Sequence, residues 1–353
     1  MVQCRAMRLP PLLAGLLLCG CSTPAAPSPP PRLEERLLLT VPADVEKFGV
    51  VVSHDGRAAA YVAMVGGKSW VGTATSRIQE FDDVSEVVVA PDGRPSFVGK
   101  KHDQWFVIIG DTRTEGYDSV SWLTFAPDGR AAAFAGSIGG KTTAVAEGRK
   151  DPLDYAAGFV FAPDGRRVVY CAEIGKARFV VSGGRKSEEY AAVGDPVVSA
   201  DGATLAFWAE RDAQRFVVVN GRSGPGFSHV WGPSLSGDGR TVAYCARDGD
   251  AFVVVNDKRG ENFENVAAPS VSADGKRIAY AAQTGAHWLT VVDGVKGEPF
   301  DVISAAVFST DGKSVAYHAV TGDRDCVVVD GRKGPAFDGV GHLVFGRGNA
   351  LAY

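Results

Sequence analysis

Short apolar runs, each closed by a turn signal, follow one another along almost the whole chain. The dipeptide Asp-Gly recurs eight times at intervals of 36 or 37 residues, and its surroundings recur with it. Residues 216–222 (FVVVNGR) and 326–332 (CVVVDGR) are copies of one segment. A fixed period of this length indicates one supersecondary unit repeated in tandem. The aspartates that mark the repeat are Asp55, Asp92, Asp128, Asp164, Asp201, Asp238, Asp274 and Asp311.

Each unit predicts four short strands, here named A to D. Strand A leads into Asp-Gly, strand B carries an Ala-Tyr or Ala-Phe pair, strand C is the valine run, and strand D is a Phe-Asp segment such as residues 336–340. Asp-Gly and Asn-Gly between apolar runs are hairpin signals, because glycine tolerates a positive φ. Four strands in about 40 residues is the spacing of a β-propeller blade. We therefore predict an all-β fold, a single β-propeller of four-stranded antiparallel blades over residues 37–353.

The number of blades follows from counting repeats. Eight complete units run from about residue 48 to residue 340, and a half repeat follows at residues 342–353. Residues 37–41 form one more strand candidate. Propellers remove exposed strand edges by pairing strands from both ends of the chain in one blade. Eight blades are favoured, with nine or seven as the alternatives.

A segment that resembles a targeting signal precedes the repeats. Arg5 and Arg8 stand before an apolar run from Leu9 to Cys19, which is too short to span a bilayer and is typical of a signal peptide. Residues 18–21 (LCGC) resemble the bacterial lipobox, although a cysteine is unusual at its second position, Cys19. The resemblance implies cleavage of residues 1–20 and lipid attachment to Cys21. An ordinary secretory signal is the alternative.

The segment after Cys21 fits a tether. Residues 21–36 are rich in Pro, Ser and Ala, which favours a flexible or extended linker. The resemblance implies, from Ser22 in place of aspartate, an outer-membrane lipoprotein facing the periplasm, with a secreted or surface-exposed protein as the alternative. Only the lipid is expected to contact the membrane. Met7 is an alternative start, since it directly heads the apolar run.

Three of the repeats carry a recognisable signature. Residues 90–93, 126–129 and 162–165 all read Ala-Pro-Asp-Gly. This resembles the repeats of TolB-type, WD-repeat-like propellers, and the likeness extends from about residue 48 to the end. It implies the propeller fold and is unspecific for activity. TolB carries an additional α/β domain before its propeller, for which this chain has no room, so a Tol-system role does not follow.

Composition supports turns and excludes one class of partner. The 43 glycines exceed the usual share of about 7%, as many tight reversals require. Lys and Arg number 37 against 41 Asp and Glu, giving a net charge of −4. This balance argues against a nucleic-acid binder. More than half of the basic residues fall in A–B and C–D turns, where aspartates are expected to balance them.

Cysteine and histidine give little evidence of chemistry. Cys171, Cys245 and Cys326 are expected to pack in the core, and no C-x-x-C pattern indicates a metal or redox site. His318 takes the strand-B position of the first two cysteines, and the other histidines are scattered over separate repeats. No metal and no cofactor are predicted. A G-x-S-x-G nucleophile elbow is absent from the sequence.

Candidate contact residues lie near the ends of the first strands, where a channel mouth is expected. Trp122 and Trp231 enter strand A near this rim, where aromatic side chains either contact a ligand or fill space between blades. We predict a monomeric, non-catalytic binding module for an envelope protein or glycan, with no catalytic residues. The alternative is a propeller hydrolase or lyase with its site at the channel mouth. The candidate rim comprises Trp122, Asp195, His229, Trp231, Asp301 and His342.

Overall fold

The computed structural model describes residues 2–8, 34–41, 47–53, 57–78, 80–90, 92–340, 343–346 and 349–352. Contacts between residues divide the chain into two compact units, Met1–Gly116 and Tyr117–Tyr353. All regular elements of the described residues are β-strands apart from a single residue of 3₁₀ conformation, and no described helix is long and apolar enough to cross a membrane. The all-β prediction is confirmed.

The first unit holds two repeat sheets and one further strand pair. All neighbouring strands are antiparallel. The pair is β1 (Val2–Arg8) and β2 (Glu34–Val41); the first repeat sheet is β3 (Lys47–Val52), β4 (Ala59–Val65) and β5 (Lys68–Gly72); the second is β6 (Asp83–Val89), β7 (Pro95–Lys101), β8 (Gln104–Ile109) and β9 (Thr112–Arg113).

Strand β2 belongs to the core of the first repeat sheet. Its Leu39 and Val41 are buried in one cluster with Tyr61 and Trp70. The strand predicted at residues 37–41 is therefore confirmed. Its partner β1 lies inside the segment that the sequence assigns to the signal peptide. The signal peptide itself stays a prediction, since residues 9–33, Cys21 among them, lie outside the described residues.

The second unit continues the series with six repeat sheets and a final strand pair. The strands are β10 (Ser119–Phe125), β11 (Ala132–Ile138), β12 (Lys141–Ala146) and β13 (Arg149–Leu153); β14 (Tyr155–Phe161), β15 (Val168–Ile174), β16 (Ala177–Ser182) and β17 (Arg185–Lys186); β18 (Ala192–Val193), β19 (Val197–Val198), β20 (Leu205–Arg211), β21 (Gln214–Val219) and β22 (Arg222–Ser223); β23 (His229–Leu235), β24 (Val242–Asp248), β25 (Asp250–Val255) and β26 (Lys258–Arg259). They continue with β27 (Asn265–Val271), β28 (Ile278–Thr284), β29 (His287–Val292) and β30 (Val295–Phe300); β31 (Val302–Ile303), β32 (Val307–Phe308), β33 (Val315–Thr321), β34 (Arg324–Val329) and β35 (Arg332–Phe337); and the pair β36 (Val344–Phe345) and β37 (Leu351–Ala352).

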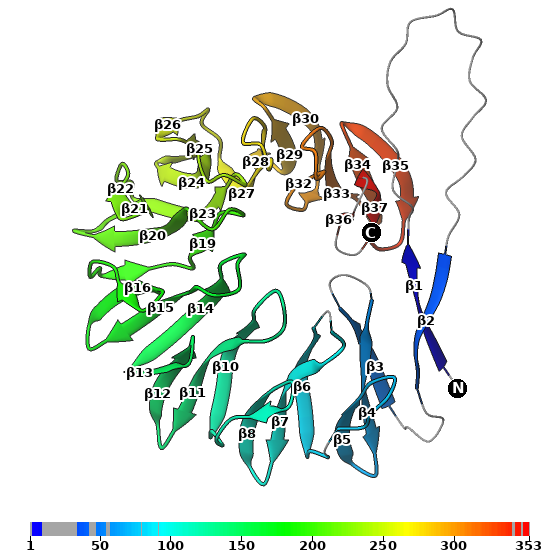
Figure 1. Ribbon diagram of the computed structural model, residues 1–353. Coiled ribbons are helices and arrows are strands. Elements are labelled where there is room, and N and C mark those ends of the chain that lie inside the picture. The colour runs from blue at the N-terminus through cyan, green and yellow to red at the C-terminus, as the bar shows by residue number, and fades with distance from the viewer. Residues whose placement is uncertain are drawn as a thin grey trace, which may run out of the picture. The chain divides into compact units, whose positions relative to one another are not determined.

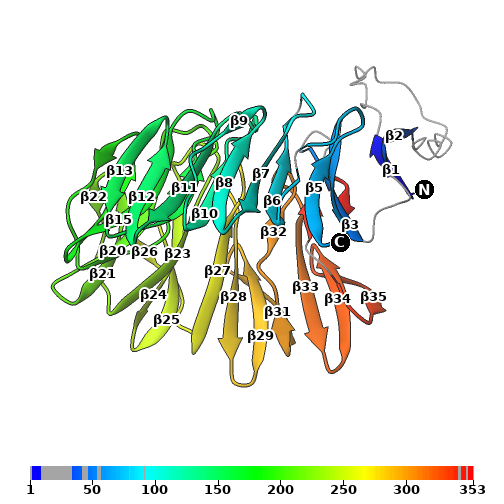
Figure 2. The same cartoon turned by 90° about the horizontal axis from the view of Figure 1, so that it is seen from below.

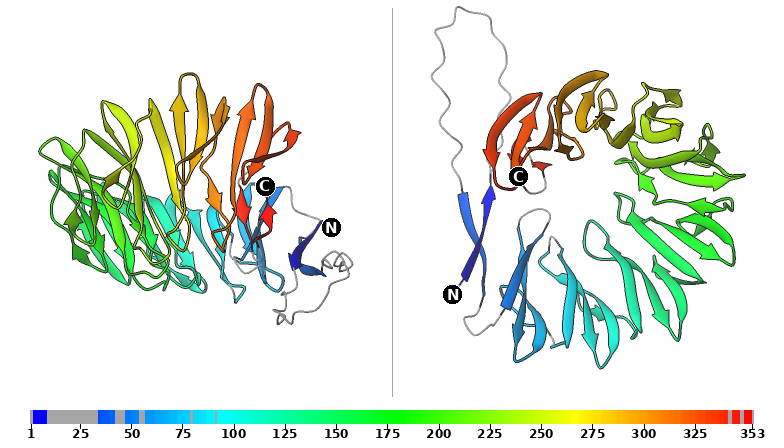
Figure 3. Two further views of the ribbon diagram at one scale, coloured as in Figure 1. Left: turned by 90° about the horizontal axis from the view of Figure 1, so that it is seen from above. Right: turned by 180° about the vertical axis from the view of Figure 1, so that it is seen from behind.

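Each repeat sheet of the second unit has the strand order A-B-C-D that the sequence predicts. Strand A is broken in two of them, as β18 with β19 and as β31 with β32. Within this unit the first strand of each sheet lies innermost and the last lies outermost (Figures 1 and 3). This is the arrangement of propeller blades, and we use the word blade for each repeat sheet. The half repeat also forms strands, β36 and β37. The number of blades in a closed propeller stays a prediction.

The core lies between consecutive blades. Ala133 and Ala144 of one blade pack with Val168 and Tyr170 of the next. The opposite face of that second blade, at Val169, packs with the following blade. Alternate residues of one strand therefore serve two interfaces, because side chains of a strand point to opposite faces. Strands B and C are consequently apolar almost throughout.

The hairpin turns have the predicted chemistry. Asn220 and Gly221 form a C–D turn with φ of 49° and 81°, the left-handed pair that a type I′ hairpin requires. Asn220 Oδ1 also accepts a hydrogen bond of 2.9 Å from the Leu205 amide, which opens strand B. Asp330 repeats this contact to Val315 at 2.9 Å. Figure 2 shows β27, β28 and β29 side by side, with turns at both ends.

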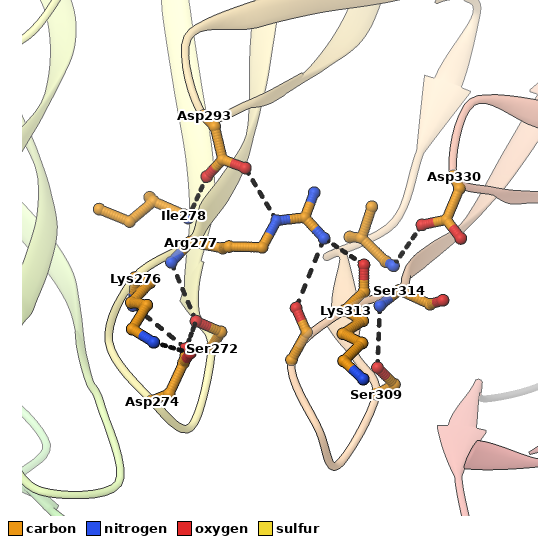
Figure 4. Close-up of polar contacts among 12 residues, drawn as sticks. Ser272, Asp274, Lys276, Arg277, Ile278, Asp293, Ser309, Lys313, Ser314 and Asp330 are labelled. Carbon is orange, nitrogen blue, oxygen red and sulfur yellow. Dashed lines mark hydrogen bonds and ion pairs between the residues drawn. The ribbon is translucent and has the colours of Figure 1, made fainter. Parts of the chain in front are cut away.

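A buried serine accepts backbone amides of the A–B turn in five of the described blades, and in four of them it also donates to the aspartate of the turn. Ser272 is buried and its hydroxyl donates to Asp274 Oδ1 at 2.7 Å (Figure 4). The same Oγ accepts the Arg277 amide at 3.0 Å, and Asp274 accepts the Lys276 amide at 3.2 Å. The Asp-Gly repeat is therefore a closed hydrogen-bonded turn. The equivalent serines are Ser199, Ser236 and Ser309, paired with Asp201, Asp238 and Asp311.

Neighbouring blades are tied together at the same turns. Arg277 forms an ion pair with Asp293 at 2.8 Å and donates through Nη1 to the carbonyl of Lys313 in the next blade at 2.5 Å (Figure 4). Thr241 reaches the Gly275 carbonyl at 3.0 Å in the same way. Hydrogen bonds from side chains of one A–B turn to carbonyls of the next thus link these blades to their neighbours.

Several basic residues at the C–D turns lie on aromatic rings. Arg259 Cζ lies 3.8 Å from the centre of the Phe252 ring, and Lys186 Nζ lies 4.5 Å from that of Phe179. Such cation–π contacts stabilise a fold by about 0.5–1 kcal/mol at exposed sites. These charges therefore help to pack the outer strands in addition to facing solvent.

Candidate functional site

The innermost strands share a bulge, which sets up the candidate site. Pairing between strands A and B shifts register once in four blades of the second unit, between Ser121 and Thr124 in the first of them. A bulge inserts an extra residue and redirects its side chain. Stepping by 36 or 37 residues gives one equivalent residue per blade, and we call this set the inner row. Its members in the second unit are Trp122, Gly158, Asp195, Gly232, Ala268 and Ala305.

Trp122 is the largest side chain of the inner row. The residue is 49% exposed, although most aromatic residues of the fold are buried. Its φ is 55°, a left-handed conformation that is unfavourable for a bulky residue. Gly158 and Gly232 hold the same conformation, with φ of 62° and 61°, at no steric cost. Trp122 therefore keeps a left-handed backbone and an exposed side chain at a position where two other blades of this unit have glycine.

Asp195 reaches across the neighbouring glycine. A Cβ atom at Gly158 would lie only 2.6 Å from Asp195 Oδ1. The carboxylate thus leans over the backbone of β14, the strand that lies next to β10 and its Trp122. Two features favour glycine at position 158: its left-handed φ, and the close approach of the Asp195 carboxylate. Figure 3 shows β10 and β14 as neighbouring inner strands.

The charge of Asp195 is isolated. The inner strands of the second unit contain no Lys or Arg and no other Asp or Glu; they cover residues 119–125, 155–161, 192–198, 229–235, 265–271 and 302–308. Asp195 is exposed, and its carboxylate makes no hydrogen bond or ion pair with any residue that the structure describes. The same charge helps to raise the pKa of the Cys171 thiol, an effect second to burial.

Trp231 and His229 occupy different environments from Trp122. Trp231 stands one residue before the bulge, pairs with Cys245, and packs on the core between two blades. It has the space-filling role that the sequence left open. His229 is exposed at the start of β23, three residues before the inner-row Gly232. The structure thus separates the two tryptophans that the sequence grouped together.

Asp301 has a structural role. Its Oδ2 accepts the Gly322 amide at 2.8 Å, and its Oδ1 lies 3.2 Å from His287 Nδ1. Asp154 makes the equivalent contact to Gly175 at 2.6 Å, so the acidic residue after strand D fixes the following B–C turn. This repetition explains the Phe-Asp segment of the repeat.

Two further histidines, His342 and His318, differ in what the structure describes of them. His342 lies outside the described residues. No group of three or more His, Cys, Asp and Glu side chains suited to a metal ion occurs in the part of the chain that the structure describes. His318 lies within its blade, with Nε2 at 3.0 Å from Asp325 Oδ2.

The cysteines are packed as predicted. Cys171 and Cys245 are buried and free of disulfides, and burial raises the pKa of each thiol to about 12. Cys326 is partly buried, and its pKa is also raised by burial. A thiol with so high a pKa is protonated at neutral pH and is a poor nucleophile.

A hollow of about 440 Å³ lies near the outer strands β30 and β35. Its Lys333 pairs with Glu298 at 2.7 Å and lies 4.7 Å from the centre of the Phe300 ring. Its charges are thus matched within the protein. The outer strands also carry Pro299 and Pro335, which discourage pairing with another chain. The inner row is therefore the stronger candidate.

Comparison with known proteins adds one structural likeness. No family model and no curated protein matches the chain. Among solved structures, the chain is similar to TolB from Acinetobacter baumannii, with 13% identity, a TM-score of 0.35, and coverage of 71% of this chain and 77% of that one. The assignment of the fold given above is based on the strand order and register of the blades themselves.

Proposed function

We propose that the protein is a lipid-anchored, non-catalytic binding module of the bacterial cell envelope, with its binding surface on the inner strands. The anchor would be Cys21, followed by the tether of residues 21–36. The partner would be an envelope protein or glycan, bound by a monomer.

One observation supports this proposal above the others. Trp122 keeps a left-handed φ of 55° and is 49% exposed. Strained backbone persists where the surrounding structure enforces it, and such positions cluster at ligand sites. Most other polar side chains of the repeat form hydrogen bonds within turns or between blades, as Ser272 and Arg277 do. The inner row therefore offers two side chains, Trp122 and Asp195, that the turns and the blade interfaces do not use.

Photocrosslinking in cells tests the proposal. A photoreactive phenylalanine derivative replaces Trp122 in one variant and Val295, 71% exposed on the outer strand β30, in the matched control. We expect a discrete crosslinked species from position 122 and none from position 295. Equal crosslinking at both positions, or crosslinking from position 295 alone, would contradict a binding surface on the inner strands.

Lipid attachment is tested separately. Cells labelled with radioactive palmitate should incorporate label into the wild-type protein and into a Cys19→Ser variant, whereas Cys21→Ser should abolish labelling. Cys19 is the matched control because it stands two residues earlier in the same segment. Retention of label by Cys21→Ser would refute the anchor while leaving the inner-strand surface untouched.

A further inference from the structure

We infer that Trp122, Gly158 and Asp195 form a site for an organic ammonium group, a refinement that rests on the proposed binding function. The three residues hold consecutive positions of the inner row, on β10, on β14 and just after β18. The site therefore combines an aromatic face, a gap without a side chain, and a carboxylate.

The gap is built into the backbone. Gly158 holds a φ of 62°, and Asp195 Oδ1 lies 2.6 Å from the place that a Cβ would take there. Pro196 Cδ lies 3.4 Å from the same point, so Asp195 and the residue after it both close on the glycine. The carboxylate is held over β14, on the side of Asp195 that faces the blade of Trp122.

The negative charge of Asp195 favours a cationic ligand. Asp195 is an acceptor without a donor in the described residues, and the inner strands of this unit hold no Lys or Arg that could neutralise it. A cation would supply the positive charge that this carboxylate lacks. Tryptophan binds cations over its ring face better than the other aromatic residues do. A neutral sugar could stack on the indole and would leave the carboxylate charge unmatched.

The other positions of the inner row differ from Trp122 and Asp195 in the size of their side chains. Its other members in the second unit are Gly158, Gly232, Ala268 and Ala305, which are glycine or alanine. Trp122 and Asp195 are therefore the two inner-row positions of this unit with side chains able to recognise a ligand. They stand one repeat before and one repeat after Gly158, over which the Asp195 carboxylate lies.

Titration of the purified full chain with matched probes tests the inference. Choline and 3,3-dimethylbutanol have the same shape and differ in charge, and methyl α-glucoside represents a neutral sugar. Binding is followed by calorimetry and by tryptophan fluorescence. We expect choline to bind at least about tenfold more tightly than its neutral isostere, the scale of one charged or cation–π contact. Nα-acetyl-lysine amide, in a parallel titration, distinguishes a lysine side chain from a free quaternary amine as the source of the cation.

Variants assign the effect to the site. Asp195→Asn and Trp122→Leu should each weaken choline binding by about tenfold, a contact of the same size. Gly158→Ala should weaken it by displacing the carboxylate. Glu189→Gln, which removes an exposed negative charge elsewhere, is the matched control and should bind normally. Thermal unfolding of each variant separates loss of binding from loss of fold.

Each outcome distinguishes the two proposals. Equal binding of choline and its isostere, or choline binding that survives Asp195→Asn, would overturn the ammonium site. Binding of methyl α-glucoside that is lost in Trp122→Leu would also overturn it, while supporting the proposed function. Crosslinking from position 122 without any preference for cations would lead to the same conclusion.

Discussion

At the scale of single residues, glycine has two structural roles in this chain, and the effect of each on stability can be measured separately. Gly331 in a C–D turn has a φ of 76° and open space where a Cβ would stand. Gly239 in an A–B turn has a φ of 66°, and its Cβ would lie 2.2 Å from Thr204 Oγ1 of the preceding blade. The first glycine serves conformation alone, whereas the second also allows two blades to approach.

We predict that alanine at these two positions has unequal effects. Gly331→Ala should lower the free energy of unfolding by about 1 kcal/mol, the cost of a left-handed alanine. Gly239→Ala should lower it by at least about 2 kcal/mol, because a clash between blades is added. Urea denaturation of both variants gives the comparison. Equal losses would show that Thr204 moves aside freely and that the turn does not fix the spacing of the blades.

The same scale shows which properties of the candidate residues can be read from the sequence and which need the structure. The sequence places Asp301 in the candidate rim, yet Asp154 makes the equivalent turn contact, so the recurrence of this acidic residue indicates a structural role. Trp122 and Trp231 look alike in the sequence and differ by one position relative to the bulge. Gly158 was missed, since a missing side chain shows its value only when the repeats are aligned at the bulge.

At the scale of the element, the A–B turn couples stability to pH. Hydrogen bonds from the serine hydroxyls are the main cause that lowers the pKa of Asp201, Asp238, Asp274 and Asp311 below the ordinary value of 3.8. A carboxyl group whose pKa is lower in the folded state stabilises the fold while it is ionised. This contribution is complete above the unfolded pKa and is lost as the pH falls through the folded pKa.

We therefore expect the urea midpoint to stay level from pH 7 to pH 5 and to fall below about pH 4, where these aspartates begin to protonate. Ser272→Ala together with Ser309→Ala should reduce that acid-induced fall, because two of the four hydroxyl donors are removed. Thr284→Ala, at an exposed position before a B–C turn, is the control. An unchanged acid profile in the double variant would contradict a role for the serine hydroxyls.

The strands themselves were predictable because their signals are local. Asp-Gly and Asn-Gly specify turns through φ, and the valine runs between them specify buried strands. The sequence thus predicted the order A-B-C-D in each repeat, and the structure confirms it. The bulge in strand A has no fixed residue type, since tryptophan and glycine both occupy it. It was therefore invisible until the register was known.

At the scale of the whole molecule, the buried thiols report on the intact blades. Cys171 and Cys245 lie in different blade interfaces, with thiol pKa values raised to about 12 by burial. We expect neither to react with a thiol reagent at pH 8 in the native protein, and both to react in urea. Cys326, which is partly buried, should react first and serves as an internal reference. Rapid native labelling of Cys245 would contradict the packing described.

The central claim is that the inner row is the binding surface, and the tryptophans allow it to be observed directly. The chain has 6 Trp, so ¹⁹F NMR of protein labelled with 5-fluorotryptophan should give a small set of resonances, with Trp122 assigned from a Trp122→Phe variant. On titration with choline, we expect the Trp122 resonance to move while that of Trp231 stays, and we expect Asp195→Asn to abolish the shift. A Trp122 resonance that stays in place while others move would contradict a binding surface on the inner row.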